Sequence, residues 1–230
     1  MKSCISRNIP EEFFTGNGPR FYYVTDRGQL AGISLESCIR RALRWGVDYV
    51  QIREKDLPDR PLYEQVRRAV DLARGTKSRI LVNGRADIAL AAGAHGVHLP
   101  STGIRIPDVK PWLPDHFLIG ISAHTEEEIK RACDEGADYV LLGHVFPTSS
   151  KSGMGSPVGL DFLRKACAGF PVPIFALGGI NALRVAPVLE TGTAGVAGIS
   201  LFQIKKEFEA LRKLYPSRMC SRKCHPRPRQ

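Results

Sequence analysis

Short apolar runs recur along the chain, and segments whose apolar residues repeat every three or four positions separate most of them. Each run is apolar at nearly every position rather than at alternate positions, which predicts strands of a parallel sheet that is buried on both faces. The eight predicted strands are Phe21–Thr25, Tyr49–Arg53, Arg79–Val82, Gly96–Leu99, Phe117–Ser122, Tyr139–Val145, Pro173–Leu177 and Val196–Ile199.

The intervening segments predict amphipathic helices that cover the sheet. Pro107, Pro111 and Pro114 crowd the segment before the fifth strand, so the pattern leaves the fourth helix open. Eight strand–helix units favour a closed (β/α)8 TIM barrel of the α/β class over an open doubly wound sheet. The predicted helices include Leu35–Arg44, Leu62–Arg74, Thr125–Gly136, Leu160–Ala168, Ala182–Gly192 and Leu201–Leu214.

Length and charge predict one domain with two extensions. At 230 residues, 43% of them hydrophobic, the chain suits a single barrel, which we expect over residues 21–215. An N-terminal extension (1–20) and a basic disordered tail (216–230) flank it. Of the net charge of +10, seven positive charges lie in Leu211–Gln230, which contains no acidic residue. The barrel itself lacks a nucleic-acid signature, so we expect no nucleic-acid partner.

The remaining composition predicts a soluble cytoplasmic protein without a membrane partner. No apolar run approaches the roughly 20 residues that cross a bilayer, and the N-terminus lacks a secretory apolar stretch. Four of the six cysteines are scattered singly, which is typical of a reducing compartment. Cys220, Cys224 and His225 match no common zinc spacing, so no metal is predicted there. A homo-oligomer is left open.

Two neighbouring strand ends have the composition of a phosphate site. The stretches 175–181 and 195–200 are short apolar runs that end in small residues and lead into helical patterns. Unpaired N–H groups and helix dipoles at such positions favour a phosphate monoester. In barrels of this type the loops after strands seven and eight are the usual phosphate site, so we expect a small phosphorylated ligand.

Further polar side chains gather at the ends of the predicted strands, where barrel enzymes place their chemistry. Gln51, Arg53 and Lys55 alternate along the second strand end and share one face, where two cations can attract an anionic substrate. A structural ion pair with Glu54 or Asp26 is the alternative. The loop 147–156 contains hydroxyls, a lysine and glycines, and it either closes over a phosphate or is a flexible surface loop.

Three histidines belong to the same strands. His124 follows the fifth strand, where a neutral imidazole can transfer a proton near pH 7; a structural role is the alternative. His98 and His144 fall within apolar strands, which favours hydrogen-bonded core residues over ligands.

At this point the chain resembles the thiamine phosphate synthase and TenI-like superfamily of barrels, from Tyr22 to about Leu214. Seven motifs match in the same order, which makes the resemblance specific. They are Tyr23-Val-Thr-Asp-Arg27, Gln51-Ile-Arg-Glu-Lys-Asp56, Val82-Asn-Gly-Arg-Ala-Asp-Ile-Ala-Leu90, Gly96-Val-His-Leu99, Gly120-Ile-Ser-Ala-His-Thr125, Gly143-His-Val-Phe-Pro-Thr148 and Ala176-Leu-Gly-Gly-Ile180.

The resemblance implies one of two activities. The synthase joins a hydroxymethylpyrimidine diphosphate to a thiazole phosphate with Mg²⁺, and its metal carboxylates are implied just after Asn83 and a few residues past the fourth strand. Those places read Gly84 and Leu99-Pro-Ser-Thr-Gly103, without an acid. A hard cation is usually held by one or two carboxylates, and Asp87 falls where a helix should already have begun.

We therefore predict a metal-independent thiazole tautomerase, an isomerase that needs only acid–base help and no cofactor. The resemblance implies that His124 carries the proton and that Gly178, Gly179, Ile199 and Ser200 hold the phosphate.

The alternative is the synthase, which would use Mg²⁺, thiazole phosphate and pyrimidine diphosphate, because many of its implied substrate contacts are present. Lys55 and Lys151 would be surplus to a ligand with a single phosphate. A non-catalytic regulatory barrel that binds thiamine-related phosphates is a second alternative. The implied substrate-binding residues are Gln51, Arg53, Lys55, Asn83, Ser122, Thr148, Ser150 and Lys151.

Overall fold

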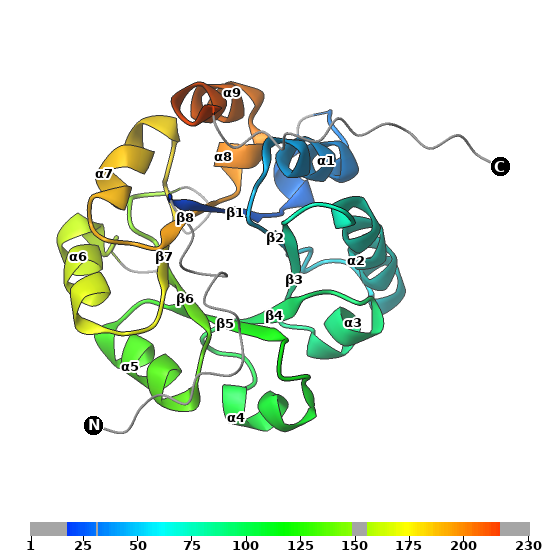
Figure 1. Cartoon of the computed structure of the whole chain (residues 1–230), viewed down its shortest axis with the longest axis horizontal. Coiled ribbons are helices and arrows are strands. Elements are labelled where there is room, and N and C mark those ends of the chain that lie inside the picture. Colours follow the sequence, from blue (N-terminus) through cyan, green and yellow to red (C-terminus); the bar gives the residue numbers. More distant parts are fainter. Residues whose placement is uncertain (1–17, 31, 149–155, 217–230) are drawn as a thin grey trace.

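The predicted barrel is confirmed by a computed structural model, which describes residues 18–30, 32–148 and 156–216. Eight parallel strands pair in chain order, and the last pairs with the first, so the sheet closes on itself (Figure 1). The strands are β1 Arg20–Val24, β2 Tyr49–Ile52, β3 Arg79–Asn83, β4 Gly96–Leu99, β5 Leu118–Ala123, β6 Tyr139–Gly143, β7 Ile174–Leu177 and β8 Gly195–Gly198.

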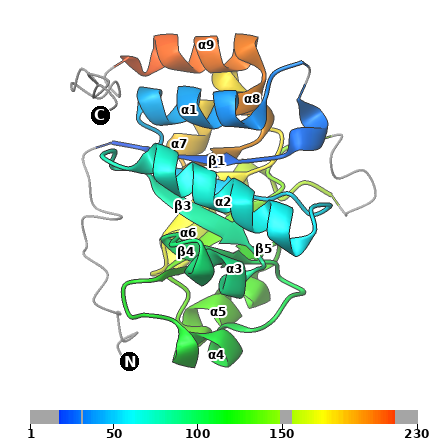
Figure 2. The ribbon, with the colours of Figure 1, turned by 90° about the vertical axis from the view of Figure 1, so that its right-hand side faces the viewer.

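Helices surround the barrel; α1 to α7 each lie between consecutive strands along the chain, and α8 and α9 follow β8 (Figures 1 and 2). Local signals set their ends: Ser34 accepts a hydrogen bond from the N–H of Ser37 at the start of the first helix, and Gly46 ends that helix with a φ of 93°. The helices are α1 Leu35–Trp45, α2 Asp59–Ala73, α3 Ala86–Ala91, α4 Ile106–Val109, α5 Glu126–Glu135, α6 Gly159–Gly169, α7 Val185–Leu189, α8 Ser200–Gln203 and α9 Lys205–Leu214.

Several predicted elements differ from the observed ones. The fourth helix is a single turn, as its prolines allow, and a 3-10 turn over Lys110–Trp112 follows it. The sixth strand ends at Gly143 rather than Val145, because its partner β7 already turns at Gly178. The helix predicted over Ala182–Gly192 is a 3-10 turn over Ala182–Arg184 followed by α7.

The helix predicted over Leu201–Leu214 is also divided, into α8 and α9, with Ile204 extended between them. A side chain explains the break. The guanidinium of Arg41 in α1 donates to the carbonyl oxygens of Phe202 and Gln203, and an unbroken helix would need those acceptors for its own N–H groups.

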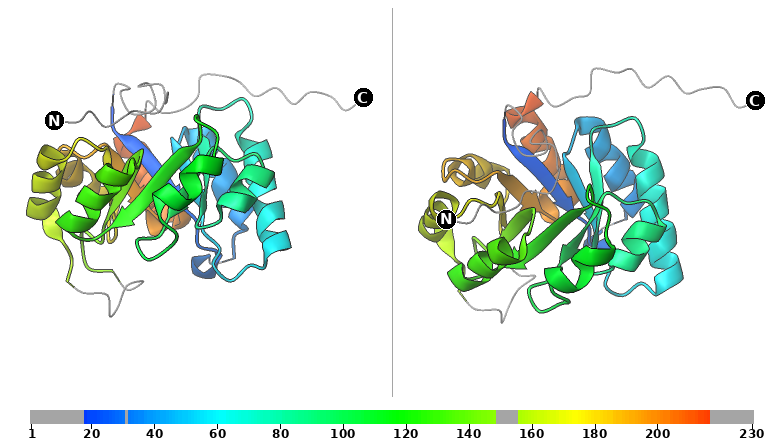
Figure 3. Two further views of the ribbon diagram at one scale, coloured as in Figure 1. Left: turned by 90° about the horizontal axis from the view of Figure 1, so that it is seen from below. Right: turned by 60° about the horizontal axis from the view of Figure 1, so that its bottom comes forward.

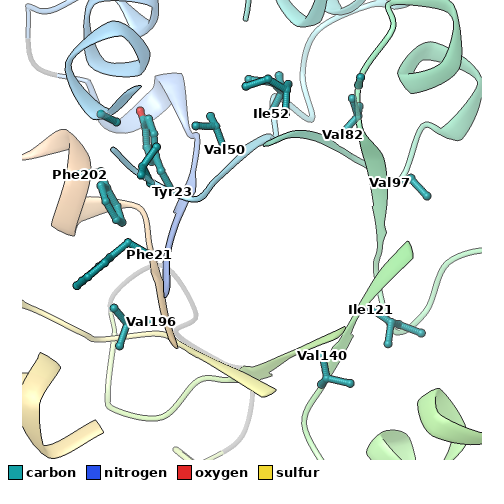
Figure 4. Close-up of a cluster of buried hydrophobic side chains, with 14 of the residues drawn as sticks. Phe21, Tyr23, Val50, Ile52, Val82, Val97, Ile121, Val140, Val196 and Phe202 are labelled. Atoms are coloured by element: carbon teal, nitrogen blue, oxygen red, sulfur yellow. The ribbon is translucent and has the colours of Figure 1, made fainter. Parts of the chain in front are cut away.

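Two apolar cores lie on opposite faces of the sheet. The larger one fills the space between strands and helices, and Figure 4 shows Val50, Val82, Val97 and Val140 pointing outward from the ring of strands. The smaller one fills the barrel interior, where the rings of Tyr22, Tyr49, Tyr139 and Phe175 pack with centroids 5.5–6.3 Å apart. The interior is therefore a packed aromatic layer rather than a channel.

Because all strands are parallel, their carboxyl ends meet at one face of the barrel, and Figure 3 shows the strands inclined across it. In the described part of the chain, no helix combines the length and the apolar character needed to cross a membrane. The predicted N-terminal extension (1–20) and basic tail (216–230), with Cys220, Cys224 and His225, lie almost entirely outside the described residues; Arg20 already belongs to β1.

Candidate active site

Four polar side chains line the barrel interior just below the carboxyl ends of neighbouring strands. Gln51 comes from β2, Asn83 from β3, His98 from β4 and Ser122 from β5. The residue before each of them points outward into the larger core, so the alternation of the strand aims these four inward. The inward placement of Gln51 agrees with the alternation predicted along this strand end, in which the next residue, Ile52, points outward.

A continuous line of hydrogen bonds joins these four residues through two buried tyrosines. The amide nitrogen of Gln51 donates to Asn83 Oδ1 (3.0 Å), and Gln51 Oε1 accepts from the hydroxyl of Tyr22 (3.2 Å). The hydroxyls of Tyr22 and Tyr139 are 2.9 Å apart. From Tyr139 the line continues to the Nδ1 atom of His98 (3.2 Å), and His98 Nε2 lies 2.9 Å from the hydroxyl of Ser122.

Burial fixes the protonation of this line. His98 is 1% exposed, and burial together with the charge of Arg53 lowers the pKa of its imidazole to about 3. Burial also raises the pKa of the Tyr22 and Tyr139 hydroxyls. His98 is therefore neutral and both tyrosines are protonated near pH 7. The prediction that His98 is a hydrogen-bonded core residue is confirmed.

The end of β2 also holds two cations that no described carboxylate pairs. Glu54, one of the predicted structural partners, is buried and accepts hydrogen bonds from the Thr25 hydroxyl (2.5 Å) and the Arg27 N–H (2.9 Å). Burial raises the pKa of its carboxyl group. Among the described residues no ion pair involves the side chains of Arg53 or Lys55. Both cations can therefore receive an anionic ligand.

On the opposite side of the barrel mouth, the turns after β7 and β8 lie side by side, since Leu177 pairs with Ala197. Gly178 and Gly179 take positive φ values of 101° and 66°. Within the described residues no hydrogen bond occupies the N–H groups of Gly179, Ile199 or Ser200. Free backbone donors on two adjacent turns suit a phosphate, as predicted from the sequence.

Arg184 connects this turn to the segment that follows β6. Its guanidinium donates to the carbonyl oxygen of Gly179 (2.6 Å) and lies 4.5 Å from the centroid of the Phe146 ring. The N–H of Phe146 in turn donates to the carbonyl oxygen of Gly178 (3.1 Å). The segment thus approaches the turn, and Thr148 is its last described residue. The predicted contacts Ser150 and Lys151 lie outside the described residues.

His124 and His144, the other two histidines of the predicted strand ends, lie near the end of β6. The Nδ1 atom of His124 contacts the carbonyl oxygen of Gly143, and the His124 N–H donates to the carboxylate of Glu128 (2.5 Å). His144 is buried and lies just past the end of β6 rather than within it. His124 is therefore on the barrel rim but at the side, next to β6.

Mg²⁺ is implied by the fold family, and the described donors do not fit it. At the rim, Asp59 and Asp87 both bind Arg85, while Asp56 binds Arg27. Asp26 accepts from Gly28 N–H (3.1 Å) and from the Gln29 amide (2.6 Å). No group of three or more His, Cys, Asp or Glu suited to a metal occurs in the part of the chain described. A carboxylate-based magnesium site is thus missing from these residues.

Comparison with known proteins places this geometry in a family. The family model described as "Thiamine monophosphate synthase" matches residues 21–202. The chain belongs to the thiamine monophosphate synthase family. Its predicted membership of the wider superfamily is confirmed, and the match covers every strand end described above.

Individual members of the family are similar over most of their length. A Geobacter sulfurreducens protein named "Putative thiamine-phosphate synthase" is 44% identical over 179 residues, which are 78% of this chain and 84% of that protein. The thiamine-phosphate synthase of Clostridium novyi is 39% identical over 79% of this chain and 89% of its own. The structure titled "Thiamine phosphate pyrophosphorylase from Pyrococcus furiosus" superimposes with a TM-score of 0.76 at 34% identity, covering 87% and 97% of the two chains.

These relatives overturn the predicted tautomerase. The proteins at 35–44% identity are named for the synthase and not for an isomerase, so the principal functional prediction is wrong. The prediction gave too much weight to the acids missing at Gly84 and Leu99–Gly103, and too little to the synthase contacts that remain. The proton-carrier role of His124 was inferred together with that reaction, and it stays an untested prediction.

Tyr22, Tyr139 and Arg184 were missed as site residues. Tyr22 and Tyr139 occupy inward-facing positions of their strands, directly below the polar strand ends. The signal that could have indicated them is a tyrosine hydroxyl in an otherwise apolar strand. Arg184 carries no comparable signal, because its contact with Phe146 depends on how two loops meet.

Proposed function

We propose that the chain joins the diphosphate ester of a hydroxymethylpyrimidine to a thiazole phosphate and releases diphosphate, as a transferase. The relatives named thiamine-phosphate synthase, at 39–44% identity over more than three quarters of the chain, carry this proposal. The barrel mouth agrees with two phosphorylated substrates, because it has side-chain cations on β2 and free backbone donors after β7 and β8.

Each substrate has a side of the mouth in this proposal. The N–H groups of Gly179, Ile199 and Ser200 bind the phosphate of the thiazole. Arg53 and Lys55 bind the diphosphate of the pyrimidine, and Gln51, Asn83 and Ser122 contact the heterocycle. Held this way, the thiazole nitrogen faces the methylene carbon of the pyrimidine.

The reaction exchanges one bond for another. The methylene carbon loses its bond to the diphosphate oxygen, which leaves with the electron pair, and the thiazole nitrogen donates its lone pair to that carbon. No proton has to move, since the product is a thiazolium cation. Arg53 and Lys55 stabilise the negative charge that grows on the departing diphosphate. Because the described residues lack a carboxylate site for Mg²⁺, the proposal assigns the stabilisation of this charge to these two cations.

The test supplies both substrates to the purified full chain and measures thiamine phosphate and released diphosphate, in parallel with and without added Mg²⁺. Stoichiometric formation of the two products supports the proposal. Arg53→Met should lower kcat/KM for the pyrimidine diphosphate by about 100-fold, because a charge-assisted contact is lost. Arg60→Met is the matched control, since Arg60 is exposed on α2 and pairs with Glu64. Binding of both substrates without coupled product would reject the proposal.

A further inference from the structure

The hydrogen-bond line below the barrel mouth has a direction, which follows from counting its hydrogens. We propose that Tyr22, Tyr139 and His98 form a positioning relay that makes Asn83 a donor and Ser122 an acceptor toward the heterocycle, and so sets which pyrimidine is accepted. The inference rests on the proposed function for the identity of its ligand. The relay itself is defined by contacts among described residues alone.

The direction starts at Gln51. Its amide nitrogen donates to Asn83 Oδ1, so its oxygen has to accept, and the only hydrogen of the Tyr22 hydroxyl goes to that oxygen. Across the 2.9 Å contact between the two tyrosines, Tyr139 is then the donor. Tyr139 has no second hydrogen, so its oxygen accepts from His98 across the next contact of 3.2 Å.

His98 passes the constraint on to Ser122. The imidazole is neutral, because burial lowers its pKa to about 3, and a neutral ring with a hydrogen on Nδ1 has none on Nε2. Ser122 therefore donates its hydroxyl hydrogen to Nε2 at 2.9 Å. Toward the barrel mouth Ser122 then offers only lone pairs.

The two ends of the relay consequently differ. Asn83 Oδ1 is occupied by Gln51, which leaves the amide hydrogens of Asn83 for the ligand. An aminopyrimidine presents an amine hydrogen and a ring-nitrogen lone pair at neighbouring positions. It satisfies both ends if its amine faces Ser122 and its ring nitrogen faces Asn83. A hydroxypyrimidine is mainly in its oxo form, so in place of the amine it would put a carbonyl acceptor against the Ser122 acceptor and a ring N–H against the Asn83 donor, which the relay rejects.

The interior is built to hold the relay in place. Tyr22, Tyr139 and His98 are each at most 1% exposed, and the tyrosine rings pack with Tyr49 and Phe175. A Cβ at Gly120 would lie 1.9 Å from the Tyr139 ring carbon that carries the hydroxyl, so this strand position has no side chain where the ring passes. Neither hydroxyl can reach water, and a reversed hydrogen bond could not be compensated by solvent.

The test reads the His98 tautomer in the full chain by ¹⁵N NMR of labelled imidazoles, with His98→Gln used to assign the signal. The relay requires hydrogen on Nδ1 and a bare Nε2. Tyr139→Phe removes the acceptor of that hydrogen and should convert His98 to the Nε2–H tautomer or a mixture. Tyr49→Phe is the matched control, because it removes a hydroxyl from the same aromatic cluster but not from the relay, and it should leave the tautomer unchanged.

Kinetics give the second measurement. Tyr139→Phe should raise the KM for the pyrimidine diphosphate by about 10-fold, the value of one hydrogen bond, and leave the KM for thiazole phosphate unchanged. The variant should also have a smaller ratio of kcat/KM for the aminopyrimidine diphosphate to kcat/KM for its hydroxypyrimidine analogue. Equal changes in both KM values would indicate general loosening of the fold and would overturn the inference.

The outcomes separate the relay from the proposed function. A wild-type His98 with hydrogen on Nε2, or a tautomer unaffected by Tyr139→Phe, overturns the relay even if thiamine phosphate is formed. The expected tautomers combined with no coupled product from the wild-type chain would reject the synthase while the relay stands.

Discussion

The two sides of the barrel mouth present their polar groups by different means. On the β2–β5 side, side chains carry the polarity, and they are linked through the barrel interior by buried hydroxyls. On the β7–β8 side, backbone N–H groups carry it, and the turn geometry of Gly178 and Gly179 exposes them. On the proposed function, the first arrangement discriminates between heterocycles, whereas the second recognises a phosphate whatever is attached to it.

The largest expected effect is a loss of stability from a substitution in the barrel interior, below the β2–β5 side of the mouth. Gly120→Ala should lower the free energy of unfolding by about 3 kcal/mol, because the new methyl group overlaps the Tyr139 ring. Urea denaturation measures the loss, and catalysis should fall with it. Gly169→Ala is the control, since no atom lies within 4 Å of that Cβ position. Equal stability of both variants would show that the interior can shift to accept a methyl group.

On the β7–β8 side of the mouth, Gly179→Ala should weaken the binding of thiazole phosphate. A Cβ there meets Phe146 Cβ and Pro147 O at 2.7 Å, and the φ of 66° adds about 1–2 kcal/mol for any residue with a Cβ. The KM for thiazole phosphate should rise by about 30-fold, as the turn has to move. Gly93→Ala has a similar φ of 71° and open space, so it should lose stability without a change in KM. A normal KM in Gly179→Ala would refute the phosphate assignment.

On the β2–β5 side of the mouth, acid should lower the stability of the folded protein because His98 is buried in its neutral form. Its pKa is about 3 in the folded protein and 6.5 when unperturbed, so below pH 6.5 the unfolded chain binds a proton that the folded one excludes. The free energy of unfolding should therefore fall by about 1.4 kcal/mol per pH unit between pH 6 and pH 4, in excess of other groups. Denaturation curves of the wild type and His98→Gln should diverge in slope over this range. Parallel pH profiles would contradict the shift.

The smallest effect should come from Lys55, which is exposed and screened by salt. Lys55→Met should lower kcat/KM for the pyrimidine diphosphate by about 5-fold at low ionic strength and less at high ionic strength. Lys77→Met, an exposed lysine that precedes β3 at the other end of the barrel, is the control. An effect independent of salt would mean that Lys55 makes a direct, desolvated contact.

The fold was predictable from the sequence because the eight apolar runs are a clear signal of buried strands. The ends of each predicted strand fall within two residues of the observed ends. Element breaks were less predictable. The division at Ile204 depends on Arg41, which lies far away in the sequence and competes for helix carbonyls. No local pattern around residue 204 contains that information.

The sequence predicted which residues lie at the candidate site but not the hydrogen bonds that connect them. Gln51, Asn83 and Ser122 were identified at strand ends, and the structure aims them into one region. The tyrosines that join them were counted as apolar strand residues, since a hydroxyl has no periodic signature. The function was mispredicted for a related reason: missing carboxylates are visible in a sequence, whereas the retained architecture of a site is visible only when strands are assembled.

The contact of the end of α8 with Asp26, just after β1, also bears on synthesis of the protein. Gln203, the last residue of α8, bonds to both the N–H and the carbonyl of Asp26 at 2.9 Å, so the segment that follows β1 is fixed by a residue that is translated 177 positions later. Ring closure, and with it the phosphate turn after β8, has to wait until that part has left the ribosome. A nascent chain stalled before residue 200 would thus have an open sheet edge, and on the proposed function it could not gain stability from phosphate binding.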